Sequence, residues 1–208
     1  MKKEKNRLKN PSFVFILFII TYFIVVGITA AQQRDTTKTI IMFGNSITHQ
    51  GNWEVVLNRK DVVNWGIPGY TTEQLSWTIK DILKQFKPKI CFIEGGINDY
   101  TLGINTERIY ENQMMVMDSL AHNKVFPVYQ TALYQLHNKK VNRAIDALNY
   151  LMRRFCEQRG YGFLDLRPVL SKDEDVIPTL TTDGTHLKPD GYTAWGKEVL
   201  KYLEEHRF

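Results

Sequence analysis

The feature that most constrains the fold is an alternation between short apolar runs of strand character and longer segments with helical periodicity. Five such runs follow one another, at residues 39–43, 61–64, 89–94, 124–129 and 162–165. This alternation is typical of a parallel sheet whose strands are joined by crossover helices. We therefore predict an α/β fold, a three-layer α/β/α sandwich around a five-stranded parallel sheet.

The helical segments lie between these runs. In residues 141–157, apolar side chains recur at spacings of three and four, and Gly160 follows as a plausible end of the helix. Thr71 and Gln74 form a capping-box pattern, which predicts a helix that begins there and continues to about residue 83. Further helices are predicted over 106–121 and 191–205.

Length and charge limit the classes of protein to consider. A chain of 208 residues fits one domain with a single buried core. The formal charge of +5 includes +4 from the first nine residues, which leaves +1 for the rest of the chain. The net charge of the predicted domain therefore gives no reason to expect a nucleic-acid partner.

The N-terminal segment has the composition of an export signal. A basic head precedes an apolar run over residues 13–28, and the small residues Ala30 and Ala31 follow. This pattern is typical of a secretory signal peptide, with an uncleaved membrane anchor as the alternative. We expect residues 1–31 to be this leader and residues 38–208 to be the folded domain, exported to the periplasm or the extracellular space. Contact with a membrane would then occur only through the leader.

The two cysteines, Cys91 and Cys156, could pair in an exported protein. A domain of this size needs no covalent staple, and both residues lie in apolar or helical patterns. We therefore expect both to be reduced core residues.

Chemically active residues follow the predicted strands. Ser46 comes directly after the first strand, and Asn98 follows the third, while Asp183 and His186 precede the last helix. The carboxyl ends of parallel strands meet at one edge of a sheet, where ligands usually bind. A serine nucleophile needs a base to remove its proton and a third group to orient that base. Ser46, His186 and Asp183 can fill these roles, although each motif alone is also consistent with an ordinary turn.

Four blocks in this order resemble the SGNH (GDSL) hydrolase superfamily, from residue 39 to the C-terminus. They are Gly44-Asn45-Ser46, Asn64 to Gly69, Gly95 to Asp99 and Asp183 to His186. The resemblance implies that Ser46 is the nucleophile and that Asp183 and His186 complete a triad. It also implies an oxyanion hole made by the N–H groups of Ser46 and Gly69 and the side chain of Asn98, with Gly66 as a rival for the glycine. The implied strand order is the flavodoxin-like 2-1-3-4-5.

The chain departs from the family pattern at Asn45, where the family usually has Asp. We expect the loop geometry to survive this near-isosteric change, while the charge beside the nucleophile is altered.

The remaining histidines have no paired ligand spacing, so we predict neither a metal nor another cofactor; they are His49, His122, His137 and His206.

These observations together predict an exported serine ester hydrolase that works through an acyl-enzyme. A small-molecule or glycan ester is the expected substrate, and we favour removal of acetyl groups from a carbohydrate. A lysophospholipase, a thioesterase or an acyltransferase would use the same residues. A non-catalytic glycan-binding module is a further alternative, which the complete set of catalytic residue types disfavours. Aromatic residues near the blocks either pack in the core, stack against a sugar ring or line an acyl pocket: Trp53, Trp65, Tyr70, Tyr100 and Tyr134.

Overall fold

The computed structural model describes residues 34–208, and the predicted leader at residues 1–31 lies outside them. The residues Asp35–Phe208 form one compact unit. Its main sheet has five parallel strands, which are β1 (Ile40–Gly44), β2 (Val62–Gly66), β3 (Ile90–Ile93), β4 (Phe126–Gln130) and β5 (Gly162–Leu164).

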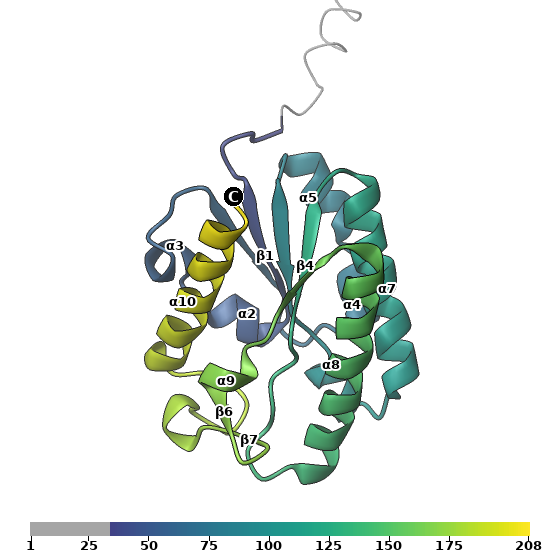
Figure 1. Cartoon of the computed structure of the whole chain (residues 1–208), viewed down its shortest axis with the longest axis vertical. Helices are drawn as coiled ribbons and strands as arrows, with labels where there is room; N and C mark the ends of the chain where they lie inside the picture. Colours follow the sequence, from purple (N-terminus) through teal and green to yellow (C-terminus); the bar gives the residue numbers. More distant parts are fainter. Residues whose placement is uncertain (1–33) are drawn as a thin grey trace, which may run out of the picture. The chain divides into compact units, whose positions relative to one another are not determined.

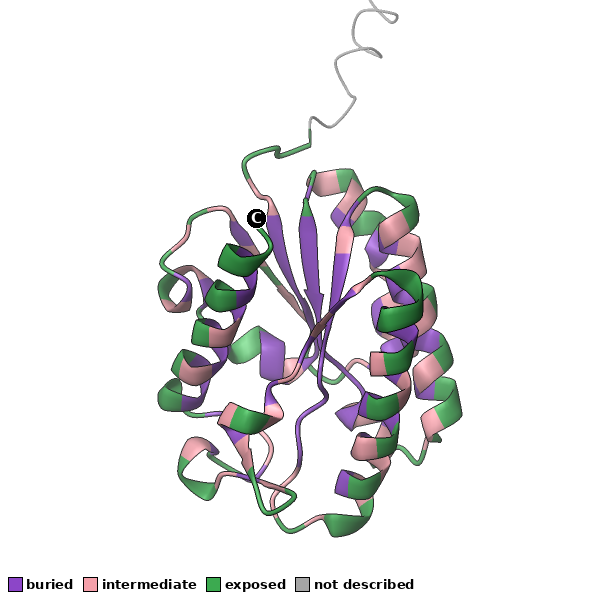
Figure 2. Cartoon of the chain, in the orientation of Figure 1, coloured by how far each residue is buried: buried purple, intermediate pink, exposed green. Residues whose placement is uncertain are grey.

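The strands are arranged in the order β2-β1-β3-β4-β5, which confirms the predicted topology. In the register of the central strands, Ile40 lies beside Val62 on one side and beside Ile90 on the other. Every residue of β1 and β3 is buried, and the sheet forms the centre of the core in Figure 2. This continuous burial is expected for parallel strands that helices cover on both faces.

Helices cover both faces of the sheet (Figure 1). One face carries α3 (Trp53–Val56) and α10 (Pro189–Glu205). The other carries α4 (Thr72–Trp77), α5 (Ile79–Gln85), α7 (Thr106–His122) and α8 (Lys139–Arg159). The shorter elements are α2 (Ser46–Gln50), α6 (Ile97–Thr101), α9 (Arg167–Leu170), the hairpin strands β6 (Ser171–Lys172) and β7 (Asp175–Val176), and the 3₁₀ turn η1 (Pro178–Leu180).

Two of the predicted helix boundaries are confirmed by their chemistry. Thr71 and Gln74 form the reciprocal capping box at the start of α4. Gly160 ends α8 in the left-handed conformation, with φ of 69°, which favours glycine.

The prediction of one helix from residue 71 to about residue 83 is wrong, because α4 and α5 are separate helices that meet at Thr78. The N–H of Thr78 bonds to the carbonyl of Leu75 at 3.0 Å, three residues back, and its hydroxyl donates to the same carbonyl at 2.9 Å. That hydroxyl also accepts a hydrogen bond from the indole N–H of Trp65. A side-chain hydroxyl thus competes with the regular helical bonding and breaks the segment.

Both cysteines are free and buried, as predicted. Cys91 lies on β3 and Cys156 on α8. Within residues 34–208, none of the helices is both long enough and apolar enough to cross a membrane.

Candidate active site

Ser46 begins α2 directly after β1, and the local sequence determines this placement. The side chain of Asn45 caps the helix, because its Oδ1 accepts a hydrogen bond from the N–H of Ile47 at 2.8 Å. Gly44 permits the close approach of two neighbouring segments. A Cβ atom at Gly44 would lie 2.2 Å from Thr48 Oγ1 and 2.6 Å from the carbonyl oxygen of Glu94.

Two buried aromatic side chains hold α2 from the α3 and α10 side. The indole N–H of Trp53 donates to the carbonyl of Thr48 at 2.8 Å, and the hydroxyl of Tyr192 donates to the carbonyl of Ile47 at 2.7 Å. Trp53 also packs edge to face against Trp195, with 4.9 Å between ring centroids. These bonds supplement the few backbone hydrogen bonds that a helix of only five residues can form. Trp53 is therefore a core residue that fixes α2, and its ring is not exposed to a ligand.

The loop before α10 is organised by the Asp183 carboxylate. Its Oδ1 accepts the N–H groups of Thr185 at 2.9 Å and His186 at 2.8 Å, and its Oδ2 lies 2.7 Å from His186 Nδ1. The backbone N–H of His186, followed by the His186 ring, lowers the pKa of Asp183 to about 2. Asp183 is therefore a carboxylate at neutral pH and can hold the imidazole in one orientation.

The structure brings Ser46 and His186 together, although 140 residues separate them in sequence. Ser46 Oγ lies 2.9 Å from His186 Nε2. Because Nδ1 faces a carboxylate, the ring proton belongs on Nδ1, and Nε2 is left to accept the hydroxyl proton. The His186 side chain is 25% exposed and that of Asp183 is 55% exposed, so the site is open to water.

Two of the three predicted oxyanion donors, Gly69 and Asn98, lie on neighbouring segments. One N–H of the Asn98 amide donates to the carbonyl of Tyr70 at 2.9 Å, which leaves its second N–H to donate elsewhere. Gly69 has φ of +79°, and nothing lies within 4 Å of a Cβ atom built there. At the rival Gly66 a Cβ atom would lie 2.2 Å from His49 N, and its own N–H bonds to the Asn64 side chain. Packing thus accounts for Gly66, and Gly69 stays the candidate donor.

A buried aspartate connects these two segments. Asp99 accepts hydrogen bonds from Thr72, from the N–H at 3.0 and 3.1 Å and from the hydroxyl at 2.6 Å. Burial raises the pKa of Asp99 despite these bonds. The alternative in which the side chains of Asn98 and Asp99 only bond their own turn is therefore wrong, because both reach residues 70–72.

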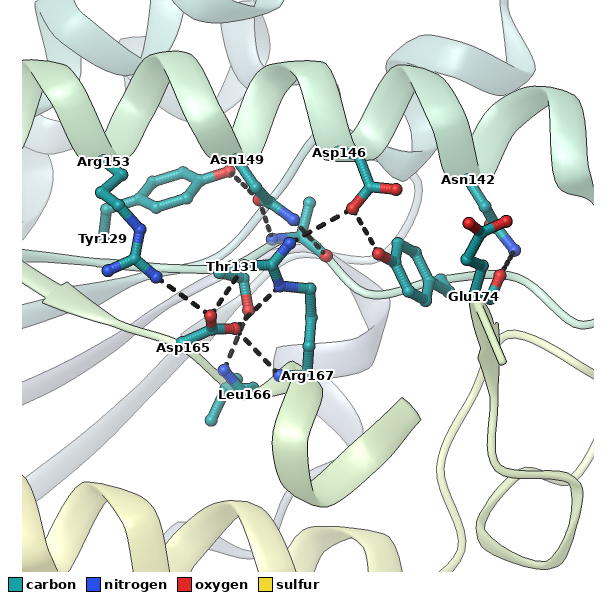
Figure 3. Close-up of polar contacts among 12 residues, drawn as sticks. Tyr129, Thr131, Asn142, Asp146, Asn149, Arg153, Asp165, Leu166, Arg167 and Glu174 are labelled. Atoms are coloured by element: carbon teal, nitrogen blue, oxygen red, sulfur yellow. Dashed lines mark hydrogen bonds and ion pairs between the residues drawn. The ribbon is translucent and has the colours of Figure 1, made fainter. Parts of the chain in front are cut away.

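The loop after β4 is fixed to α8 by a polar network that sequence reasoning missed (Figure 3). Asn149 accepts hydrogen bonds from the Tyr129 hydroxyl at 3.0 Å and from the N–H of Ala132 at 2.9 Å. Tyr134 donates to Asp146, which also contacts Arg167. Tyr134 is therefore buried in this network, and its ring packs in the core.

The loop after β4 also contacts the loop that carries His186. The N–H of Leu136 donates to the carbonyl of Gly184 at 2.8 Å, and the Gln135 side chain donates to Thr185 Oγ1 at 3.2 Å. Asn142 on α8 bonds both to the backbone N–H and to the carbonyl of Gln135. The position of His186 therefore depends on α8, which has no motif of its own in the sequence.

Within the described part of the chain, no group of three or more His, Cys, Asp or Glu side chains is close enough to hold a metal ion. The arrangement of hydroxyl, imidazole and carboxylate can generate a nucleophile from the protein's own groups.

Comparison with known proteins identifies the family of this chain. Residues 42–194 match the model of the GDSL-like Lipase/Acylhydrolase family. The chain belongs to this family. It is accordingly a hydrolase that acts on ester bonds.

Relatives of this GDSL-like hydrolase include an N-acylneuraminate cytidylyltransferase of Streptococcus agalactiae serotype III (strain NEM316). It is 35% identical over 180 residues, which cover 86% of this chain and 41% of that protein. The chain thus spans less than half of this relative's length.

Two solved structures share the fold. A GDSL-like lipase from Bacteroides thetaiotaomicron VPI-5482 has a TM-score of 0.73 at 18% identity, with 89% of this chain and 97% of that chain covered. An acetyl xylan esterase has a TM-score of 0.67 at 16% identity, with 79% and 99% covered. At these identities the likeness concerns the fold alone.

Proposed function

We propose that this GDSL-like hydrolase is an exported serine esterase that removes acetyl groups from a carbohydrate through an acyl-enzyme. The observation that carries the proposal is the continuous path of hydrogen bonds from Ser46 through His186 to Asp183, with distances of 2.9 and 2.7 Å. A hydroxyl, an imidazole and a carboxylate in this order form a nucleophile, a base and its orienting group.

In the first half of the reaction, His186 Nε2 takes the proton of Ser46, and Ser46 Oγ attacks the ester carbonyl carbon. The imidazolium that forms is stabilised by Asp183. The negative oxygen of the tetrahedral intermediate accepts hydrogen bonds from the N–H of Ser46, the N–H of Gly69 and the second N–H of Asn98. His186 then gives its proton to the leaving alcohol.

In the second half, water attacks the acyl carbon on Ser46, and His186 again takes the proton. It returns this proton to Ser46 Oγ as the bond between Oγ and the acyl carbon breaks and the acid leaves. The N–H of Ser46 lies in the first turn of α2, where backbone N–H groups have no acceptor within the helix. This arrangement supports its role as a donor in both tetrahedral intermediates.

The substrate is inferred from the openness of the site and from what relatives are named for. The exposed Asp183 side chain and the partly exposed His186 side chain support access by a bulky, hydrated leaving group such as a sugar. One relative is named for N-acylneuraminate, a sugar acid, and one structural neighbour for acetyl xylan. Both names support a carbohydrate substrate, and the acetyl xylan name supports an acetyl ester.

Purified residues 35–208 should be assayed with the nitrophenyl esters of acetate, butyrate and octanoate. We expect acetate to be preferred and Ser46→Ala to abolish turnover. Ser119→Ala on α7, remote from the triad in sequence, serves as the matched control and should behave like the wild type. Equal rates for the wild type and Ser46→Ala would refute the enzyme mechanism, and a preference for octanoate would favour a lipid ester.

A second assay addresses the natural substrate. Acetate release should be measured from acetylated xylan oligosaccharides and from O-acetylated N-acylneuraminate. Release from either one by the wild type, but not by Ser46→Ala, supports the carbohydrate assignment. Transfer of the acetyl group to a sugar acceptor in place of acetate release would identify an acyltransferase instead.

Export is proposed from the composition of residues 1–31. The test is the N-terminal sequence and location of the full chain expressed in a bacterial host. A mature N-terminus near residue 31 outside the cytoplasm is expected, and an intact N-terminus in the membrane fraction would identify an anchor. Retention of the whole chain in the cytoplasm would contradict export.

A further inference from the structure

A buried carboxyl group that the mechanism does not use lies beside Thr48 and Asn45, the residues that flank the nucleophile in the segment after β1. Glu94 directly follows β3, and its N–H donates to the carbonyl of Phe43 on β1 at 2.9 Å. Its side chain is fully buried. Among residues 34–208, no Lys, Arg or His side chain forms an ion pair with it. A buried carboxylate without a cation is costly, so this group favours its protonated form.

The polar groups around Glu94 come from the nucleophile loop. Its Oε2 lies 3.5 Å from Thr48 Oγ1. Its Oε1 and the Nδ2 of Asn45 are both buried, and neither has a hydrogen-bond partner within normal length among the described residues. The Asn45 side chain is nevertheless near enough to favour the charged form of Glu94. A donor and an acceptor thus lie beside each other with no competing partner.

The groups that face Glu94 from the other elements add no positive charge. They are Asp99 on α6, Tyr129 on β4 and Tyr192 on α10. Burial raises the pKa of Glu94 to about 8, and the neighbouring polar side chains of Thr48 and Asn45 offset this only in part. At neutral pH the carboxyl group is therefore mostly a neutral acid, which can both donate and accept a hydrogen bond.

This neighbour explains the departure at Asn45. A carboxylate at position 45 would share a buried site with Glu94, and two such groups cannot both ionise there. An amide keeps the acceptor that caps α2 and adds a donor toward Glu94. The buried carboxyl of this site thus lies at the end of β3 instead of next to the nucleophile.

We propose that Glu94 is a positioning residue for the nucleophile, which braces Asn45 and Thr48 on either side of Ser46. The inference rests on the proposed function, in which Ser46 attacks the ester. The brace acts on the start of α2 and touches neither the substrate nor His186. Its loss should therefore lower kcat and leave KM nearly unchanged.

The experiment is an exchange of the two side-chain types. Asn45→Asp alone puts two carboxyls in one buried site and should lower kcat by roughly ten- to a hundredfold through misplacement of Ser46. Glu94→Gln alone keeps the shape and should retain most activity at neutral pH. The double variant Asn45→Asp/Glu94→Gln restores one amide and one carboxyl, so it should recover most of the lost kcat. Losses that simply multiply in the double variant would overturn the proposal.

A pH profile gives a second, independent readout. Deprotonation of Glu94 in alkaline solution should loosen the brace, so the kcat of the wild type should fall above pH of about 8. Glu94→Gln cannot ionise and should lack that decline. If Asn45→Asp does not fold, this comparison alone decides, and an identical alkaline decline in both proteins would overturn the proposal.

The variants distinguish failure of the proposed mechanism from failure of the proposed role of Glu94. Ser46→Ala with wild-type activity would refute the mechanism itself. An inactive Ser46→Ala together with no recovery in the exchange variant, and with an unchanged alkaline decline, would refute only the role of Glu94.

Discussion

The two halves of the active site are built in opposite ways. The nucleophile half lies at the end of β1, where Asn45 and Glu94 are fully buried and α2 is held by the core residues Trp53 and Tyr192. The base half is a surface loop, in which Asp183 is exposed and is held mainly by local backbone N–H groups.

The difference in burial shifts the pKa values of the carboxyl groups of Glu94 and Asp183 in opposite directions. Burial without a cation raises the pKa of Glu94 to about 8. Two backbone N–H groups and the imidazole lower the pKa of Asp183 to about 2. The same chemical group is therefore mostly neutral in one half, where we propose a positioning role, and charged in the other, where we propose that it orients the base. The difference in protonation comes from solvation and hydrogen bonding, because both residues carry the same carboxyl group.

The largest expected effect comes from the contact that joins the two halves. His186→Ala removes the base, and kcat should fall by a factor on the order of 10⁴ to 10⁶, as far as for Ser46→Ala. The double variant should be no slower than either single variant, because the two residues act as a unit. Steady-state kinetics with nitrophenyl acetate measures this, with the exposed His206→Ala as control. Additive losses would show that the two halves act separately.

A smaller effect is expected from the charged orienter. In Asp183→Asn the Oδ1 acceptor of the turn survives, but an amide N–H₂ replaces the oxygen that faces His186 Nδ1. We expect kcat to fall by roughly 10² to 10⁴, with the unfolding temperature almost unchanged, because the residue is exposed. The nearby exposed Asp190→Asn is the control. Wild-type kinetics in Asp183→Asn would refute its role in orienting the ring.

A substitution of Asn98 tests whether the segments that carry Gly69 and Asn98 take part in the reaction or only support the fold. Asn98→Ala removes the bond to Tyr70 and the proposed oxyanion donor, and kcat should fall by about 10² to 10³. Asn123→Ala, at the exposed end of α7, should leave kcat unchanged. A lower unfolding temperature with normal kcat would assign Asn98 to the scaffold alone.

The smallest expected effect concerns stability at the buried half. The pKa of Glu94 is raised to about 8 from 4.5, so between these values the folded state holds a proton that the unfolded state has released. The free energy of unfolding of the wild type should therefore fall as pH rises through this window. Glu94→Gln should remove that decline and be more stable above pH 8, by about 1 to 3 kcal/mol.

Urea denaturation of wild type and Glu94→Gln at pH 5 and pH 8.5 tests this sign. The exposed Glu111→Gln on α7 serves as control and should keep the wild-type decline. The opposite sign, with Glu94→Gln less stable at high pH, would mean that Glu94 is a stabilised carboxylate.

Much of the framework could be predicted from sequence because strong local patterns carry it. The five strands were placed within two residues of their ends, and the capping box and Gly160 marked helix boundaries correctly. The short helices α2, α3, α6 and α9 and the β6–β7 hairpin were missed, because two to five residues are too few to show a period. The break at Thr78 was missed because a distant tryptophan bonds its hydroxyl.

The sequence by itself determined the residue types of the candidate site, since a strand followed by Ser46 and an Asp183-x-x-His186 loop predict a nucleophile and an oriented base through local chemistry. Only the tertiary structure decided that these groups meet and that Asp99 joins the segment after β3 to the segment after β2. It also decided that Glu94 is buried beside Asn45, where its pKa is raised. Distances across a sheet and the loss of solvent around a carboxyl depend on which segments pack together. No local pattern in the chain encodes them.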